Sequence, residues 1–408
     1  MTDEPRRSPH EGKKRLRILI GGDTFAPEIN GAVRFTTRLA AGLVARGHDV
    51  HIAAPARSNR RLGPQIEEHE GQRMTVHRIY SWRWPPHPWL RFALPWRIKQ
   101  NSAKILDLVQ PDVMHFQSHI VMGRGMTIEG GKRGVRLIGT NHFMPENLLD
   151  YTAIIPPFLK RKAIRAAWNA ADRSFRRAER VTTPTRKAAD YLEANTSVRD
   201  VLAISCGIDA SEYTPVMEPR SDNLIVFVGR VAEEKQIDKL IRAFAKLDPS
   251  LGAQLEIVGG GDQETGLAAL ASQLGVADRV TFAGYVDEQY LRTALARATV
   301  FAMPSIAELQ SISTLEAMAT GLPVVAADAM ALPHLVHDGE NGFLFEPGNV
   351  DDLADKLTRV LSMTHEEILV LKRESLRIVA AHDIQTTLDT FESLYRGEPV
   401  DTPDASLH

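Results

Sequence analysis

Two carboxylates and two cations in the second half of the chain have the types and spacing for chemistry on a phosphorylated sugar. Glu308 and Glu316 lie within the stretch 304–328, PSIAELQSISTLEAMATGLPVVAAD, with seven residues between them. A carboxylate repels phosphate but accepts hydrogen bonds from sugar hydroxyls. Arg230 and Lys235 follow an apolar run, and such cations suit a diphosphate.

Each carboxylate also has a structural interpretation. Ser313-x-x-Glu316 matches a capping box, in which a glutamate closes the first turn of a helix. Glu308 alone is compatible with a solvated loop position. The residues by themselves leave both interpretations open.

The elements around these residues are predicted by apolar runs and helix stops. Residues 299–303 and 323–327 are expected strands, and residues 311–320 form a helix that stops at Gly321. A helix that begins after the carboxyl end of a strand directs its free amides and positive dipole end towards that edge. The edge is therefore the expected phosphate site.

The rest of the second half alternates strand and helix. Residues 224–228 form a strand that ends at Gly229-Arg230, and residues 254–258 lead into a glycine loop that admits close approach, Gly259 and Gly260 included. An NAD-dependent oxidoreductase would need a third glycine at position 264, which is Glu264, so that alternative fits poorly.

The first half opens with a strand, a loop, a helix and a strand, at 16–20, 21–33, 34–46 and 49–53. This order is typical of a doubly wound parallel sheet. Gly31 at the helix start lets backbone amides approach a phosphate. Further strands are expected at 112–116, 135–139 and 180–183. His142 follows the second of these, at the edge where open α/β sheets place their sites, although a lone histidine is often structural.

Composition indicates a cytoplasmic protein. The single cysteine, Cys206, excludes an intramolecular disulfide and a cysteine-based zinc site. The charged N-terminus lacks the apolar core of a signal peptide, and no apolar run reaches the length of a membrane span.

Charge is distributed unevenly along the chain. Residues 1–200 hold 34 Lys and Arg against 19 Asp and Glu, whereas the remainder holds 15 against 32. The two halves are therefore expected to meet different partners, or to attract one another. Residues 80–100 combine arginines with Trp82, Trp84, Trp89 and Trp96, and residues 158–180 form a basic amphipathic helix. Both segments suit an anionic membrane surface. Single-stranded nucleic acid and a loop packed on its own domain are the alternatives for residues 80–100, and a solvated charged face is the alternative for residues 158–180.

Taken together, the motifs resemble glycosyltransferase family 4. The resemblance rests on Gly229-Arg230 with Lys235, the Glu308–Glu316 pair followed by EAMATGLPVV, the glycine near Asn30-Gly31, and NGFLFEPGN near residue 345. It implies an α/β GT-B fold of two facing Rossmann-like doubly wound domains with a cleft between them. It also implies a retaining reaction without a metal. The segments DTFAPEINGAVR and GTNHFMPEN are similar to members that glycosylate membrane lipids, such as phosphatidylinositol mannosyltransferases and diacylglycerol glucosyltransferases.

The resemblance implies a role for each site residue. Arg230 and Lys235 would stabilise the leaving diphosphate, Glu308 would hold sugar hydroxyls, and Glu316 the ribose. His142 would line the sugar site and share a catalytic role with Arg230, Lys235 and Glu308. The remaining donor-site residues would be Gly31, Gly259, Gly260, Ser311 and Ile312. The acceptor side would hold Asp23, Asn30 and His142.

The sequence departs from the family pattern at two places. After Glu308 the family has a small residue, Phe and Gly, where this chain has Leu309-Gln310-Ser311. Ser311 leaves the backbone amides available but narrows the loop. Cys206 stands where the family commonly has Asn.

The resulting prediction is a retaining, metal-independent hexosyltransferase that needs no cofactor. It would move a hexose from a GDP-mannose or UDP-glucose type of donor to a lipid or glycolipid at an anionic membrane, and it would bind no nucleic acid. A soluble sugar phosphate or inositol phosphate is the alternative acceptor, and a nucleotide-binding oxidoreductase a distant alternative. The expected segments are a disordered lead (1–15), the acceptor domain (16–203), the nucleotide-sugar domain (204–385), a helix that returns to the first domain (386–398) and a tail (399–408).

Overall fold

The computed structural model describes residues 14–28, 30–58, 60–83, 91–145, 157–220 and 222–400. Most of the expected disordered lead and of the tail lies outside the described residues, as do Trp84 and Trp89. Among the described residues, no helix is long and apolar enough to cross a membrane.

The chain divides into two compact units, each an α/β domain with a largely parallel sheet. Unit 1 comprises residues 1–204 and 388–408, and unit 2 comprises residues 205–387. The predicted fold class, two Rossmann-like doubly wound domains, is confirmed.

Unit 1 is built on an eight-stranded sheet in the order β10-β9-β8-β7-β1-β2-β4-β3, in which only β3 runs antiparallel to its neighbour. The predicted strands appear within a residue or two of their expected bounds. The strand bounds are β1 Arg17–Gly21, β2 Asp49–Pro55, β3 Gly63–His69, β4 Gln72–Ile79, β7 Val113–Phe116, β8 Arg136–Thr140, β9 Arg180–Thr183 and β10 Leu202–Ala203.

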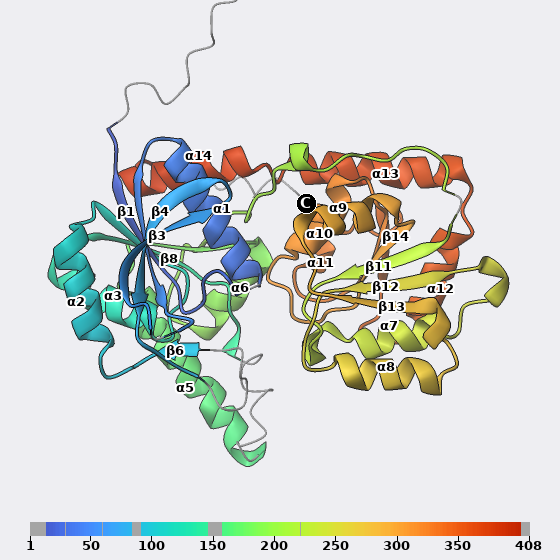
Figure 1. The fold of residues 1–408 in the computed structure, drawn as a ribbon, viewed down its shortest axis with the longest axis horizontal. Helices are drawn as coiled ribbons and strands as arrows, with labels where there is room; N and C mark the ends of the chain where they lie inside the picture. The colour runs from blue at the N-terminus through green and yellow to red at the C-terminus, as the bar shows by residue number, and fades with distance from the viewer. Residues whose placement is uncertain are drawn as a thin grey trace, which may run out of the picture. The chain divides into compact units, whose positions relative to one another are not determined.

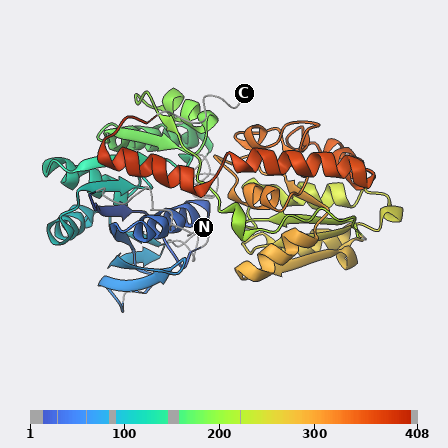
Figure 2. The same cartoon turned by 90° about the horizontal axis from the view of Figure 1, so that it is seen from above.

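Helices cover both faces of this sheet (Figure 1). One face packs on α2 (Ile98–Val109), α3 (Met122–Lys132), α5 (Pro157–Phe175) and α6 (Arg186–Asn195). The other carries α1 (Gly31–Ala45) and the C-terminal part of α14 (Ile384–Arg396), which lie side by side in Figure 2. Gly42 permits this close packing, because a Cβ there would lie 2.5 Å from Leu388.

In the aromatic segment of unit 1, two short strands among the described residues pair as a small hairpin, and the last residues begin α2. Strands β5 (Ser81–Arg83) and β6 (Arg91–Ala93) pair antiparallel, with Trp82 opposite Phe92. Trp82 and Trp96 are 48% and 76% exposed. Both side chains expose a large part of their surface, and the alternative of a loop packed on its own domain stays a prediction.

The basic segment 158–180 is helical only as far as Phe175, where α5 ends. Trp168 and Phe175 are buried in the core, whereas most of the arginines on this helix are exposed. Arg180 already belongs to β9. The amphipathic prediction is confirmed over the length of α5.

Unit 2 has a six-stranded, fully parallel sheet in the order β13-β12-β11-β14-β15-β16. Its central strands are buried along almost their whole length. The strands are β11 Leu224–Val228, β12 Gln254–Val258, β13 Val280–Gly284, β14 Val300–Met303, β15 Val324–Ala327 and β16 Gly342–Phe345. The helices are α7 Ile237–Phe244, α8 Glu264–Gln273, α9 Glu288–Arg297, α10 Ile312–Ala319, α11 Leu332–Leu335, α12 Val350–Leu361 and α13 His365–Ala380.

Candidate active site

The sequence-predicted cations of unit 2 lie together with two carboxylates at the carboxyl edge of the sheet. Arg230 follows β11, and Nη2 of its guanidinium lies 2.5 Å from Oε1 of Glu234. The ammonium of Lys235 donates to Oε1 of Glu308, which comes from the loop after β14. Four charged side chains, two of each sign, thus form one cluster from segments about 70 residues apart in the sequence.

Burial acts on the charges of this cluster. It lowers the pKa of Arg230, and the charges of Asp262 and Glu308 oppose that shift. Burial also raises the pKa of Glu234, against the attraction of Lys235. Charged groups are costly to bury unless paired, so an anion that reaches Arg230 and Lys235 meets cations that are only partly hydrated.

The loop that carries Glu308 is fastened to the turn that carries Lys235. The carbonyl oxygen of Glu234 accepts from the amide of Ile306 at 3.2 Å and from the hydroxyl of Ser305 at 3.3 Å. These bonds fix the spacing between Lys235 and Glu308. Lys235 itself ends a short 3-10 turn that precedes α7, rather than beginning the helix.

Glu316 is buried within α10, with 1% of its surface exposed. The N-cap of this helix is Ser311, whose side chain accepts from the amide of Thr314, so helix position N3 is Thr314. The capping-box interpretation with Ser313 is therefore wrong, because Glu316 lies in the second turn. Ile312, predicted as a donor contact, is the first residue of the helix, where amides lack partners within the helix.

The glycine loop after β12 is required by packing against the backbone that carries Arg230. A Cβ on Gly259 would lie 2.0 Å from the carbonyl oxygen of Gly229, and one on Gly261 the same distance from that of Val231. Gly260 accepts from the amide of Val231 at 3.0 Å and lies under the ring of Tyr285. The loop thereby supports the backbone on both sides of Arg230, and its contact with a donor stays a prediction.

The two departures from the family pattern meet in unit 2. Oε1 of Gln310 accepts from the amide of Cys206 at 2.7 Å, and Nε2 of Gln310 donates to the hydroxyl of Ser205 at 3.0 Å. Gln310 therefore ties the loop of Glu308 to the first residues of the unit. The bond to residue 206 uses its backbone amide rather than the thiol of Cys206, and this contact is not visible in the sequence.

In unit 1, the predicted residues gather at the carboxyl ends of three neighbouring strands. Nε2 of His142, after β8, lies 2.8 Å from Oε1 of Gln117, which follows β7. Asp23, after β1, is buried and accepts from the hydroxyl of Ser118 at 2.5 Å and from the amide of Met122 at 2.9 Å. Asp23 thus caps α3, and burial raises the pKa of its carboxyl.

The start of α1 has a similar local explanation. Asn30 is the N-cap, and its side chain accepts from the amide of Val33 at 2.9 Å. Gly31 is the first helical residue and is exposed. The predicted contacts of Asp23, Asn30 and Gly31 with substrates stay predictions.

Sequence reasoning missed Gln117, Glu234, Asp262 and Tyr285. Gln117 could have been found, because it follows a predicted strand just as His142 follows the next one. Glu234 stands in the run EEK beside Lys235, but its contact with Arg230 depends on the turn.

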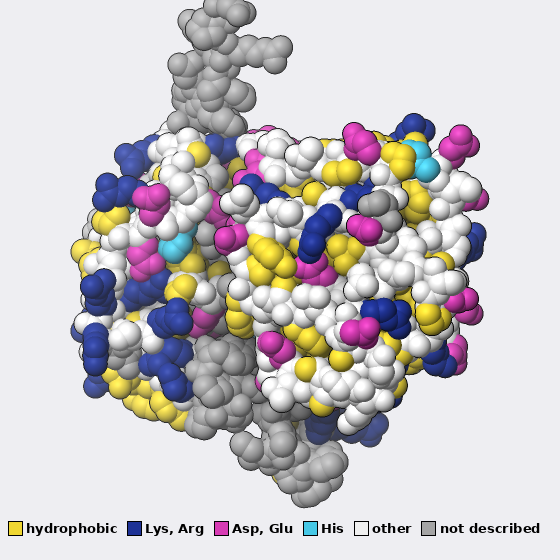
Figure 3. Space-filling view, turned by 45° about the vertical axis from the view of Figure 1, so that its right-hand side comes forward, with side chains coloured by type: hydrophobic (Ala, Val, Ile, Leu, Met, Phe, Trp, Pro, Cys, Tyr) yellow, Lys and Arg dark blue, Asp and Glu magenta, His cyan; other side chains and the backbone are white. Residues whose placement is uncertain are grey.

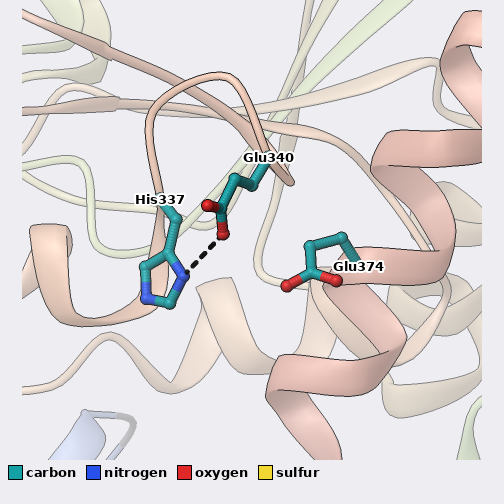
Figure 4. Close-up of side chains that lie close together, drawn as sticks. All are labelled: His337, Glu340 and Glu374. Carbon is teal, nitrogen blue, oxygen red and sulfur yellow. Dashed lines mark ion pairs between the residues drawn. The ribbon is translucent and has the colours of Figure 1, made fainter. Parts of the chain in front are cut away.

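A separate cluster of one histidine and two glutamates lies in the last third of the chain. Within the described part of the chain, His337, Glu340 and Glu374 place potential ligand atoms within 4.8 Å of one another (Figure 4). Nδ1 of His337 lies 3.3 Å from Oε2 of Glu340. Glu374, however, accepts two hydrogen bonds from Nε of Arg377, at 2.8 and 2.9 Å. The guanidinium already supplies the cation, so we assign no metal there.

Family comparison decides the class of enzyme. The family described as "Glycosyltransferase Family 4" matches residues 29–212, and the family "Glycosyl transferases group 1" matches residues 215–375. The chain belongs to glycosyltransferase family 4. A family 4 glycosyltransferase uses a nucleotide sugar as its donor, which removes the oxidoreductase alternative.

Relatives of this glycosyltransferase are named for different substrates and products. It is 28% identical over 340 residues to the GDP-mannose-dependent alpha-mannosyltransferase of Mycolicibacterium smegmatis, covering 81% of this chain and 84% of that protein. It is 26% identical over 349 residues to the alpha-monoglucosyldiacylglycerol synthase of Acholeplasma laidlawii, with 81% and 85% covered. It is 33% identical over 204 residues to the D-inositol 3-phosphate glycosyltransferase of M. smegmatis, with 46% and 45% covered.

Solved structures share the fold of this glycosyltransferase. Sucrose-phosphate synthase of Thermosynechococcus elongatus superposes with a TM-score of 0.76 at 20% identity, over 93% of this chain and 99% of that one. Anabaena HepE, in complex with UDP-glucose, superposes with a TM-score of 0.73 at 18% identity, over 94% and 100%. The GT-B fold is confirmed.

Proposed function

We propose that this enzyme is a retaining, metal-independent hexosyltransferase that transfers a hexose from a nucleotide-diphospho-sugar to a lipid acceptor at an anionic membrane surface. The observation that carries the catalytic part is the cluster of Arg230, Glu234, Lys235 and Glu308. The charged, exposed surface of unit 1 is the observation that supports a lipid acceptor.

The cluster suits departure of a nucleotide diphosphate. Cleavage of the sugar–phosphate bond leaves negative charge on the leaving group, and positioned cations stabilise that charge most where water is excluded. Arg230 and Lys235 supply two cations from a rigid turn. They take the part that a metal ion would otherwise play, which supports independence from metal.

Glu308 is placed to exchange partners when the donor arrives. Its carboxylate holds the ammonium of Lys235 and is only 8% exposed. When a diphosphate binds Lys235, the carboxylate becomes available to accept hydrogen bonds from sugar hydroxyls. Phosphate and sugar are therefore recognised by neighbouring groups.

The donor is of the GDP-mannose or UDP-glucose type. One relative is named for GDP-mannose, and a structural neighbour was solved with UDP-glucose. Thermal unfolding with GDP-mannose, UDP-glucose, UDP-galactose, UDP-glucuronate and NAD tests this choice, since a ligand that binds the folded state raises the midpoint.

A lipid acceptor is supported by the surface of unit 1. Trp82 and Trp96 are exposed near arginines of the hairpin, and α5 presents Lys and Arg side chains outward. Many Lys and Arg side chains are visible on the face drawn in Figure 3. Each cation near an anionic bilayer contributes about 1 kcal/mol, so a handful gives reversible docking.

Sedimentation with liposomes tests the docking. The protein should bind vesicles that contain phosphatidylglycerol at low salt, should bind them less at high salt, and should not bind neutral vesicles. The triple variant Arg173→Glu, Arg176→Glu and Arg177→Glu should lose binding. A matched triple variant in unit 2, Arg242→Glu, Lys246→Glu and Arg359→Glu, should keep it.

The soluble-acceptor alternative is tested in the same series. It is supported by the relative named for D-inositol 3-phosphate. If the protein ignores anionic vesicles at low salt while it glycosylates an inositol phosphate, the lipid proposal is wrong and the sugar-transfer proposal stands.

A further inference from the structure

A buried polar chain lies behind His142 in unit 1. Gln117 lies between His142 and His115, with its amide nitrogen 3.2 Å from the ring nitrogens of His115. His115 in turn lies 2.6 Å from the hydroxyl of Tyr395, on α14, and 2.6 Å from that of Thr140. His115, Gln117 and Tyr395 are almost fully buried.

The orientation of Gln117 decides which nitrogen of His142 carries the proton. The atom of Gln117 that faces Nε2 of His142 is the carbonyl oxygen Oε1. A carbonyl oxygen only accepts, so Nε2 must donate, and in the neutral ring Nδ1 is left as an acceptor. An imidazole in this state can accept a hydrogen bond from a sugar hydroxyl, whereas an imidazolium cannot.

The surroundings of His142 keep the ring neutral. Burial lowers its pKa to about 3, and burial lowers the pKa of His115 to about 3 as well. Phe35 of α1 packs 4.9 Å from the His142 ring, and Phe391 of α14 packs 5.6 Å from Phe35. The described contacts of the His142 ring are thus the amide of Gln117 and the ring of Phe35. Phe391 packs on Phe35, and His115 and Tyr395 lie behind the amide.

We propose that Gln117 is a positioning residue that fixes His142 as a neutral hydrogen-bond acceptor for the donor sugar. The proposal rests on the proposed function, because it requires His142 to line the sugar site. Gln117 need not touch the sugar. It acts through the proton on Nε2, and His115 and Tyr395 hold the other end of its amide in place.

Gln117→Glu tests this role with little change of shape. A carboxylate would still accept from Nε2 but would also stabilise the imidazolium, so His142 should titrate at a pH about 1–3 pH units higher. Nitrogen-15 spectra of the histidine rings read this directly. In the wild-type protein His142 should be protonated on Nε2 alone and should not titrate above about pH 5.

Kinetics supply the second readout. The turnover of Gln117→Glu should approach that of the wild type at pH 8.5, fall about twofold at the new pKa of His142 and fall about tenfold one pH unit below it, because only the neutral ring can accept the hydrogen bond. Gln100→Glu, the same substitution at an exposed site on α2, should leave the profile unchanged. A purely structural role for Gln117 would change the rate equally at every pH.

The outcomes separate this proposal from the proposed function. Protonation on Nδ1 in the wild-type protein, or an unchanged titration of His142 in Gln117→Glu, overturns the proposal while the sugar-transfer activity stands. If His142→Ala transfers sugar at the wild-type rate, the sugar-site role of His142 falls, and with it the proposal. If no nucleotide sugar in the donor panel is bound or turned over, the proposed function itself fails.

Discussion

Glu308 and Glu316 show what the residue type alone predicts about a site and what depends on the folded chain. Their spacing alone leaves a functional and a structural interpretation open, and the structure places one beside Lys235 and the other inside α10. Both could be singled out as candidate site residues, because a carboxylate near a predicted phosphate edge is unusual. The pairing of Lys235 with Glu308 was not readable, because it depends on how two loops meet.

The two carboxylates should respond differently to removal of their charge. Glu308→Gln should lower turnover by about 100-fold with little change in affinity for free GDP or UDP, because its bonds to the sugar matter most in the transition state. Calorimetry with the bare nucleotide measures the affinity, and initial rates measure the turnover.

Glu316→Gln should instead weaken binding of the free nucleotide. The two oxygens of a carboxylate accept hydrogen bonds from two ribose hydroxyls, whereas a glutamine amide has only one oxygen that accepts. An unchanged affinity for GDP and UDP would remove Glu316 from the ribose site. The structure already excludes the capping role that would have explained a silent substitution.

At the scale of elements, the strands were predictable and the turns between them were not. β11 and β12 have the predicted bounds, because buried parallel strands are continuous apolar runs. The β3–β4 pair and the β5–β6 hairpin were missed. β3 is a half-exposed edge strand, β4 mixes polar and apolar residues, and β5 and β6 are three residues long each. Between β11 and β12 the chain forms a 3-10 turn and then α7, with Gln236 between them at φ 49°.

The glycine loop provides a prediction at this scale. Gly259→Ala should destabilise unit 2 by about 2 kcal/mol or more, because its Cβ would overlap the Gly229 carbonyl and its φ of 125° strains any other residue. Gly266→Ala is the matched control. It lies in α8 with open space around its Cβ, and should stabilise the helix by up to about 1 kcal/mol. Urea unfolding compares them, and equal midpoints would contradict the packing role of the loop.

At the scale of the whole molecule, several buried histidines make stability depend on pH. Burial lowers the pKa of His77 and His119 to about 4, whereas an unfolded histidine titrates near 6.5. The unfolded state binds more protons between these values. The contribution of these histidines to the free energy of unfolding is therefore fully present above about pH 6.5 and is lost as the pH falls towards 4.

His119→Phe isolates one of these contributions. The ring of His119 packs 5.5 Å from Phe175 and 6.1 Å from Phe143, so a phenyl ring suits the site. Compared with the wild type, the variant should gain about 2–3 kcal/mol in relative stability between pH 6.5 and pH 4.5, since each pH unit is worth about 1.4 kcal/mol per proton. Groups such as Glu28, whose pKa burial raises to about 7, contribute with the opposite sign and cancel in this difference. A stability difference that is constant with pH would contradict the depressed pKa.

The fold class and the family could be predicted from the sequence, because each motif at a strand end is a continuous run of residues. The contacts between the site residues could not be predicted from the sequence. Gln117 with His142, Gln310 with Cys206, and Glu234 with Arg230 each join segments or turns whose meeting depends on the folded chain.

The central claim is that Arg230 and Lys235, rather than a metal ion, stabilise the departing nucleotide diphosphate. Its most direct test is the initial rate of hexose transfer in excess EDTA. GDP-mannose and UDP-glucose serve as donors, and phosphatidylglycerol vesicles with phosphatidylinositol or diacylglycerol serve as acceptors. The wild type and Lys246→Ala, a surface control, should keep their rates, whereas Arg230→Ala and Lys235→Ala should lose about 100–1000-fold. Transfer that EDTA abolishes and manganese restores, or near-normal turnover by Lys235→Ala, would contradict the account.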